Sequence, residues 1–154
     1  MNGKGGRSMQ TCLFLCTGNY YRSRFAEIYF NALAGREGVL WQAESRGLHI
    51  EAPNPGPISQ ATLAWLRNLQ IEPPAQLRMP LSASEEDFLR ANVIVAVKEA
   101  EHRPLMIRKH PAWVDRVEYW HIHDQDVAQP QQAIPELISH VDQLFKRLLS
   151  QSGK

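Results

Sequence analysis

The residues with the clearest chemical potential are Cys16 and Arg22, separated by five residues in the segment 16–23, whose sequence is CTGNYYRS. A cysteine thiolate is a strong nucleophile, and a planar guanidinium offers paired donors that suit two oxygens of a phosphate-like dianion. Gly18 would allow this segment a positive φ and bring its backbone close to a ligand. Ser23 can donate a hydrogen bond to the thiolate. The spacing therefore predicts a nucleophile that faces a tetrahedral oxyanion.

Two apolar patterns flank this segment. The uninterrupted run Cys12–Cys16 is typical of a strand buried on both faces. Apolar side chains recur with helical spacing from Phe25 to Leu33, and Gly35 would end that helix. The segment would then lie at a helix N-terminus, where backbone N–H groups and the helix dipole attract an anion.

Farther along the chain, strand-like and helix-like patterns alternate. The patterns predict strands at 39–43, 93–97 and, more weakly, 117–122. They predict helices at 63–69, from a Ser84–Asp87 capping box to residue 90, and at 134–148 with Pro135 in the first turn. Three prolines make 53–57 a loop. Such alternation is typical of an α/β fold with a mostly parallel sheet, whose ligands bind at the carboxyl ends of the strands.

Composition sets the class of protein. The chain has 154 residues, of which 44% are apolar and 21% charged, with a formal net charge of +1. We expect a flexible leader at 1–9, one domain at 10–150 and a short tail at 151–154. No basic block or long apolar segment is present, so we expect neither nucleic-acid nor membrane binding. With two cysteines there is no disulfide framework, which favours the cytoplasm.

The segment 13–23 resembles the phosphate-binding loop of the low-molecular-weight protein tyrosine phosphatases, and it lies near the N-terminus as it does in them. The segments 43–48, 91–95 and 119–124 are similar to later parts of the family. The resemblance implies a single three-layer α/β domain with a small, about four-stranded parallel sheet flanked by helices. It also implies hydrolysis through a phosphocysteine, with no cofactor. The residues expected to bind substrate are Thr17, Gly18, Asn19, Tyr20, Tyr21 and Ser23; within this group, Asn19 would brace the loop.

The chain departs from the family pattern at several positions. Tyr21 replaces a second cysteine that often precedes the loop arginine. Cys12 cannot replace it in a disulfide, because four residues of strand separate it from Cys16 by about 13 Å. Arg24 replaces a proline and would add a positive charge near the pocket mouth. Asn92 stands where the family usually has aspartate.

Catalysis also needs a general acid, which protonates the leaving group and later activates water. We expect this acid to be Asp124, which follows the strand candidate and occupies the family position, with Asp126 as the alternative. The surrounding loop lacks the proline and aromatics that are typical of relatives. We expect no metal site, because His121 and His123 lack the further ligands that zinc requires. At least one of the adjacent tyrosines Tyr20 and Tyr21 is expected at the pocket mouth.

The sequence thus predicts an enzyme that hydrolyses phosphotyrosine in proteins, or small aryl phosphates. Two alternatives stay open. One is an arsenate reductase of the same fold, although such enzymes usually use more cysteines than the two present here. The other is a phosphate-loop module that binds phosphorylated partners with little turnover.

Overall fold

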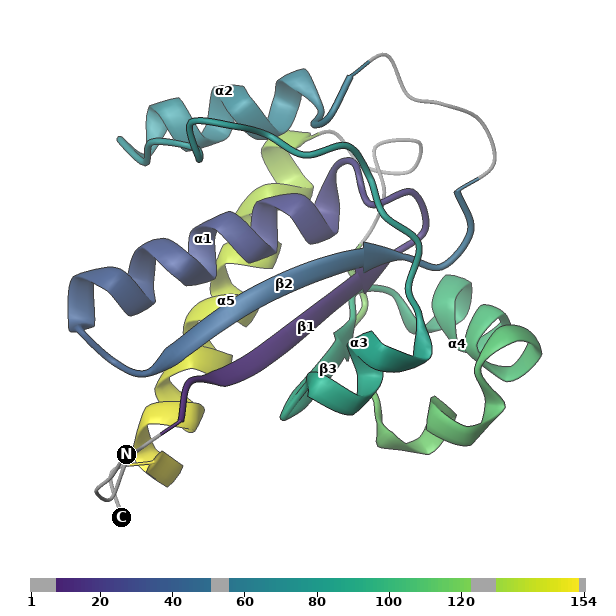
Figure 1. Ribbon diagram of the computed structural model, residues 1–154. Coiled ribbons are helices and arrows are strands. Elements are labelled where there is room, and N and C mark those ends of the chain that lie inside the picture. Colours follow the sequence, from purple (N-terminus) through teal and green to yellow (C-terminus); the bar gives the residue numbers. More distant parts are fainter. Residues whose placement is uncertain (1–7, 51–55, 123–129, 153–154) are drawn as a thin grey trace.

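A computed structural model describes residues 8–50, 56–122 and 130–152 of the chain (Figure 1). One parallel sheet forms its centre, with the strand order β2-β1-β3-β4. The bounds are Gln10–Cys16 for β1, Trp41–Gly47 for β2, Val93–Ala96 for β3 and Glu118–Tyr119 for β4. The predicted four-stranded α/β architecture is therefore confirmed.

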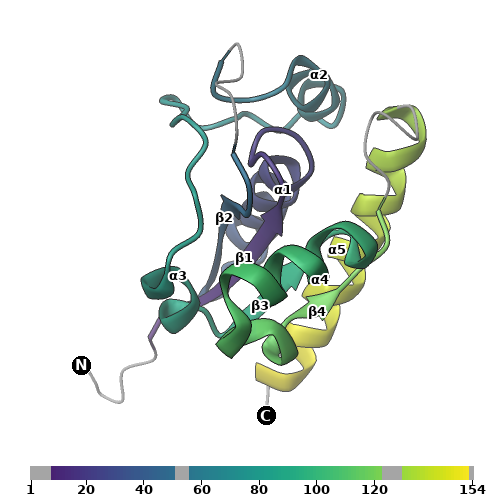
Figure 2. The ribbon, with the colours of Figure 1, turned by 90° about the vertical axis from the view of Figure 1, so that its right-hand side faces the viewer.

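Five α-helices and one 3-10 helix surround the sheet in the described part of the chain. Their bounds are Arg22–Glu37 (α1), Gln60–Asn68 (α2), Glu85–Arg90 (α3), Glu99–Lys109 (α4), Pro111–Arg116 (η1) and Pro130–Ser152 (α5). Helices α1 and α5 cover one face of the sheet, and α3 and α4 cover the other, which gives three layers (Figure 2).

Strand β1 connects the two cores because its side chains alternate between the faces. Phe14 belongs to the cluster beneath α1 and α5, where its ring meets Phe30 edge-on at 6.0 Å between centroids. Leu13 and Leu15 belong to the cluster beneath α3 and α4, together with Phe88 and Met106. The residues from Thr11 to Cys16 are all buried, as the continuous apolar run predicts.

Several predicted boundaries are wrong; the strand predicted at 117–122, for example, spans only Glu118–Tyr119. The first helix passes through Gly35 and ends at Glu37, because Gly38 supplies the left-handed φ of 67° that a helix C-terminus favours. The second strand spans Trp41–Gly47 instead of the predicted 39–43. Buried and more exposed residues alternate along it, and its second half consists mainly of polar residues. Pro135 lies inside α5 rather than in its first turn, because the helix begins at Pro130.

Helix α4 had no counterpart in the sequence prediction. Its sequence lacks a continuous apolar stripe and contains Pro104, which usually ends a helix. Only His102 and Met106 of this helix are buried. Across the described residues, no helix has the length and apolar character needed to cross a membrane.

Candidate active site

The segment between Cys16 and Arg22 follows the carboxyl end of β1 and leads directly into α1. Its first residues are held by the two residues that directly follow β2: the N–H of Leu48 donates to the Cys16 carbonyl at 2.9 Å, and that of His49 to the Thr17 carbonyl at 3.0 Å. Gly47 allows this approach, because a Cβ there would lie 2.8 Å from the Thr17 carbonyl oxygen. The loop therefore lies where the N-terminus of a 16-residue helix favours an anion.

The sulfur of Cys16 has a hydroxyl beside it. Ser23 Oγ lies 2.9 Å from Cys16 Sγ, and both residues are buried. The side-chain amide of Asn19 donates to the same hydroxyl oxygen at 2.9 Å, and the hydroxyl can donate its own proton to the sulfur. A hydrogen bond from this hydroxyl is strongest when its acceptor is charged, as a thiolate is.

The left-handed residue of the loop is Asn19, whose φ is 53°. Gly18 does not adopt a positive φ, so the left-handed conformation expected for it is wrong. Asparagine tolerates the left-handed region better than other residues with a side chain. It can also use its amide for bonds that glycine could not make, which explains why asparagine suits this position.

The amide of Asn19 is fully hydrogen-bonded and completely buried. Its nitrogen donates to Ser23 Oγ and to Ser45 Oγ, each at 2.9 Å. Its oxygen accepts from Arg78 Nη1 at 2.9 Å and from the Leu81 backbone N–H at 3.0 Å. These four bonds tie the loop to β2 and to the segment before α3. Sequence reasoning missed Arg78 because 59 residues separate it from Asn19.

Arg24 lies beneath the loop, not at the pocket mouth where it was expected. Its side chain is 2% exposed, and its Nη1 lies 3.4 Å from Glu27 Oε1. Burial lowers the pKa of the Arg24 guanidinium. Arg78 reaches the same Glu27 oxygen at 3.4 Å, and burial followed by the charge of Arg24 lowers the pKa of Arg78 to about 10. Glu27 thus offsets two cations that would repel each other.

Arg22 is buried at the first position of α1, and a carboxylate from α4 contacts it. Its Nη2 lies 3.1 Å from Glu101 Oε2 and its Nη1 3.5 Å from Glu101 Oε1. Nη1 also donates to the Ile122 carbonyl at 3.4 Å. The hydroxyl of Thr17 donates to Glu101 Oε2. No local pattern predicts this contact, since 79 residues separate Arg22 from Glu101.

The two adjacent tyrosines have different surroundings. Tyr20 is partly exposed, whereas Tyr21 is 5% exposed and belongs to the core cluster beneath α1 and α5. The expectation that they cannot both pack inward holds. A substrate contact through the Tyr21 side chain does not fit this burial, so of the two rings only Tyr20 remains for the mouth.

Several sequence candidates fall outside the described residues. Asp124, Asp126 and His123 belong to the segment 123–129, and the first prolines of the predicted loop belong to 51–55. Within the ranges that the structure describes, no three His, Cys, Asp or Glu side chains come together as a metal site.

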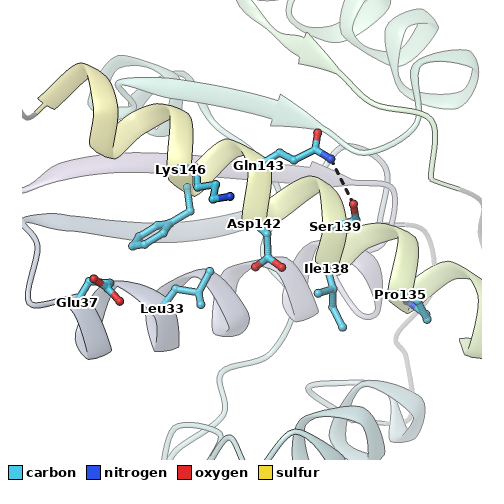
Figure 3. Close-up of a pocket in the computed structure, with 9 residues that line it drawn as sticks. Leu33, Glu37, Pro135, Ile138, Ser139, Asp142, Gln143 and Lys146 are labelled. Atoms are coloured by element: carbon cyan, nitrogen blue, oxygen red, sulfur yellow. Dashed lines mark hydrogen bonds between the residues drawn. The ribbon is translucent and has the colours of Figure 1, made fainter.

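A groove outside the loop lies between α1 and α5 (Figure 3). Leu33 and Glu37 from α1 line one side, and α5 lines the other with Ile138 and Asp142, among others. Gln143 donates a hydrogen bond to Ser139 at 3.3 Å along its rim. No residue of the segment 16–23 lines this groove, so it is separate from the candidate site.

Comparison with known proteins agrees with this geometry. The family model described as low molecular weight phosphotyrosine protein phosphatase matches residues 11–151. Among curated proteins no sequence matches the chain. A solution structure of a low molecular weight protein tyrosine phosphatase from Bacillus subtilis has 23% identity and a TM-score of 0.75, over 94% of this chain and all of the other (100%).

Two further structures show the same fold. A low molecular weight protein tyrosine phosphatase from T. tengcongensis has 23% identity and a TM-score of 0.73, over 92% of this chain and 99% of the other. The YwlE arginine phosphatase from Geobacillus stearothermophilus has 19% identity and a TM-score of 0.73, over 92% of this chain and 94% of the other. With a family model that matches nearly the whole chain, the resemblance of the loop is confirmed: this chain belongs to the low molecular weight phosphotyrosine protein phosphatase family.

Proposed function

We propose that this protein hydrolyses phosphotyrosine in proteins, or small aryl phosphates, through a phosphocysteine and without a metal or cofactor. The observation that supports this most is the hydroxyl of Ser23 at 2.9 Å from Cys16 Sγ, at the N-terminus of α1. That pair would supply a thiolate directly beneath the backbone N–H groups of the loop. The partly exposed ring of Tyr20 would stack on the aryl group of a substrate.

In this mechanism Cys16 attacks phosphorus in line with the departing ester oxygen. The loop N–H groups and Arg22 hold the equatorial oxygens, where negative charge spreads in the transition state. The P–O bond to the leaving group breaks, and Asp124 gives that oxygen its proton. The same carboxylate then takes a proton from water, which displaces phosphate from the cysteine. Asp126 is the alternative acid.

The test of the nucleophile uses para-nitrophenyl phosphate. We expect the wild-type protein to turn it over and Cys16→Ser to lose the activity by several orders of magnitude. A Cys12→Ser variant is the matched control, because Cys12 is buried in β1 among core side chains. Turnover that survives Cys16→Ser unchanged would refute the proposal.

The test of the general acid compares aryl phosphates with good and poor leaving groups. Asp124→Asn should slow hydrolysis of the poor leaving groups more, because only they need a proton in the transition state. Asp126→Asn is the control. An equal loss for all substrates in Asp124→Asn, or a leaving-group effect confined to Asp126→Asn, would remove Asp124 from this role.

Substrate class is tested by competition. Phosphotyrosine, phosphoarginine and phosphoserine peptides are offered at equal concentration, because the solved structures with this fold include arginine phosphatases. We expect kcat/KM to be highest for phosphotyrosine. Tight binding of the phosphotyrosine peptide without hydrolysis would instead favour the non-enzymatic module.

Arsenate reduction is the other alternative, and the position of Cys12 argues against it. A disulfide relay needs a second thiol that reaches the first, whereas Cys12 is completely buried. Burial, the largest cause, raises the pKa of the Cys12 thiol well above its ordinary value, which disfavours the reactive thiolate. Thiol-dependent arsenate turnover in vitro would overturn this reasoning. The cytoplasmic location inferred from the cysteine count stays a prediction.

A further inference from the structure

One carboxylate contacts both ends of the candidate phosphate loop. The hydroxyl of Thr17, the first residue after Cys16, donates to Glu101, and the guanidinium of Arg22 at the end of the loop reaches the same carboxylate at 3.1 Å. Glu101 belongs to α4, an element that contributes nothing to the sequence motif. A contact at both ends can hold the loop at a fixed width.

Helix α4 presents Glu101 in a fixed position. The helix begins at Glu99, so Glu101 lies in its first turn, where the helix dipole favours a negative charge. Its side chain is 29% exposed, so solvent reaches only part of the carboxylate.

His102 supports the same contact. The backbone N–H of Lys98 donates to His102 Nδ1 at 3.1 Å, which leaves the proton of a neutral imidazole on Nε2. His102 Nε2 lies 3.1 Å from Thr17 Oγ1 and 3.5 Å from Glu101 Oε2. A directional chain of donors therefore runs from the imidazole through the Thr17 hydroxyl to the carboxylate.

Charge explains why such a contact is needed. The first turn of α1 contains Arg22 and Arg24 and no acidic residue, although cations are unfavourable at a helix N-terminus. Glu27 is paired with Arg24, and Glu101 with Arg22. A guanidinium has two donor edges, and Glu101 contacts the edge formed by Nη1 and Nη2.

We propose that Glu101 is a positioning residue: anchored by the Thr17 hydroxyl, it holds Arg22 so that the guanidinium matches the transition state of phosphoryl transfer. This proposal rests on the proposed function, because it names the partner that aligns the same site. Glu101 itself touches no reacting atom in this account. Its effect is transmitted through Arg22.

Glu101 does not fit the role of general acid. The hydrogen bond from His102, followed by those from Thr17 and Arg22, holds the pKa of the Glu101 carboxyl well below its ordinary value, although burial opposes this. A group that stays ionised near neutral pH has no proton to give to a leaving group. The position of Glu101 between two loop residues is instead that of a structural support for the loop.

The test compares Glu101→Gln with the matched control Glu99→Gln. Glu99 lies two residues away on α4 and pairs with Arg103 at 2.8 Å instead of with the loop. We expect Glu101→Gln to lower kcat for para-nitrophenyl phosphate by about tenfold or more with KM changed less than about threefold, since misalignment weakens mainly transition-state interactions. Glu99→Gln should retain wild-type kinetics. A Glu101→Gln variant with wild-type kcat would overturn the proposal.

Oxyanion binding measured by calorimetry needs no turnover. Vanadate resembles the five-coordinate transition state, whereas phosphate is the product. Glu101→Gln should therefore lower the affinity for vanadate by about tenfold and change the affinity for phosphate by less than about threefold. Tighter binding of both anions in Glu101→Gln would overturn the proposal, because the carboxylate would then be a competitor for Arg22. A wild-type protein without turnover would refute the proposed function, while the two affinities still decide the role of Glu101.

A double-mutant cycle separates positioning from general loss of structure. If Glu101 acts through Arg22, then Glu101→Gln should change vanadate affinity less than about twofold in an Arg22→Lys background. The same tenfold loss in both backgrounds would show an effect independent of Arg22 and would contradict the proposal.

Discussion

Replacement of Asn19 tests how the phosphate loop is kept in its conformation. Asn19→Ala removes four hydrogen bonds of 2.9–3.0 Å, at about 1 kcal/mol each, and places alanine at a φ of 53°, which costs about 1 kcal/mol more. We therefore expect the free energy of unfolding to fall by about 3–5 kcal/mol. That is a large part of the stability of an ordinary domain.

Asn19→Gly is the matched variant, because it loses the same hydrogen bonds without the strain of a Cβ at positive φ. It should be about 1 kcal/mol more stable than Asn19→Ala. The measurement is urea unfolding at pH 7, followed through the fluorescence of the four tryptophans. A loss below about 1 kcal/mol for Asn19→Ala would refute the hydrogen-bond reasoning. Equal stability of the two variants would refute the argument from φ.

Three further predictions concern other parts of the site and fold. Gly47→Ala places a Cβ 2.8 Å from the Thr17 carbonyl, so we expect lower kcat and a stability loss of about 1–3 kcal/mol; the control Gly35→Ala, with open space around it, should keep wild-type kinetics. Asp87→Asn weakens the capping box of α3 and a 2.7 Å pair with Arg90, and should cost about 2–4 kcal/mol at pH 7. Burial raises the pKa of Asp87, but the hydrogen bonds from Ser84 and the charge of Arg46 lower it overall. Its stabilisation is therefore present above the unfolded pKa of about 4 and is lost as pH falls below that value. Urea unfolding should show a constant stability gap between Asp87→Asn and wild type from about pH 7 to pH 5 and a narrowing gap below about pH 4; a gap that does not narrow there would contradict this. Peroxide should form no disulfide between Cys12 and Cys16, so mass spectrometry of the oxidised protein that found this bond would contradict the strand geometry.

The loop and its flanking elements were predictable from sequence because their signals are local. An uninterrupted apolar run, Gly18 and a helical stripe lie within about 25 consecutive residues, and β1 and α1 follow from them. The capping box of Ser84 and Asp87 is a local signal too, and α3 begins directly after it as predicted. Such patterns need no knowledge of the remaining chain.

The residues that brace the loop were not predictable in this way. Arg78 and Glu101 reach it only after β2, β3 and α4 have folded against β1, and no spacing in the sequence marks either of them. The expectation that Arg24 lies at the pocket mouth is wrong for a related reason. A buried arginine can be predicted only together with the partner that offsets its charge, and no sequence pattern marks Glu27 as that partner. The left-handed residue was assigned to Gly18 on general preference, whereas the hydrogen bonds of its side chain favour Asn19 there.

The most direct test of the whole account is to trap the phosphorylated enzyme. The protein is mixed with para-nitrophenyl phosphate, denatured within milliseconds at alkaline pH, digested and analysed by mass spectrometry. We predict one phosphoryl group on the peptide that contains Cys16, and none on that peptide in a Cys16→Ala variant or on the peptide that contains Asp124. A protein that releases phosphate while every trapped peptide is unmodified, or that is modified at another residue, would contradict nucleophilic attack by Cys16.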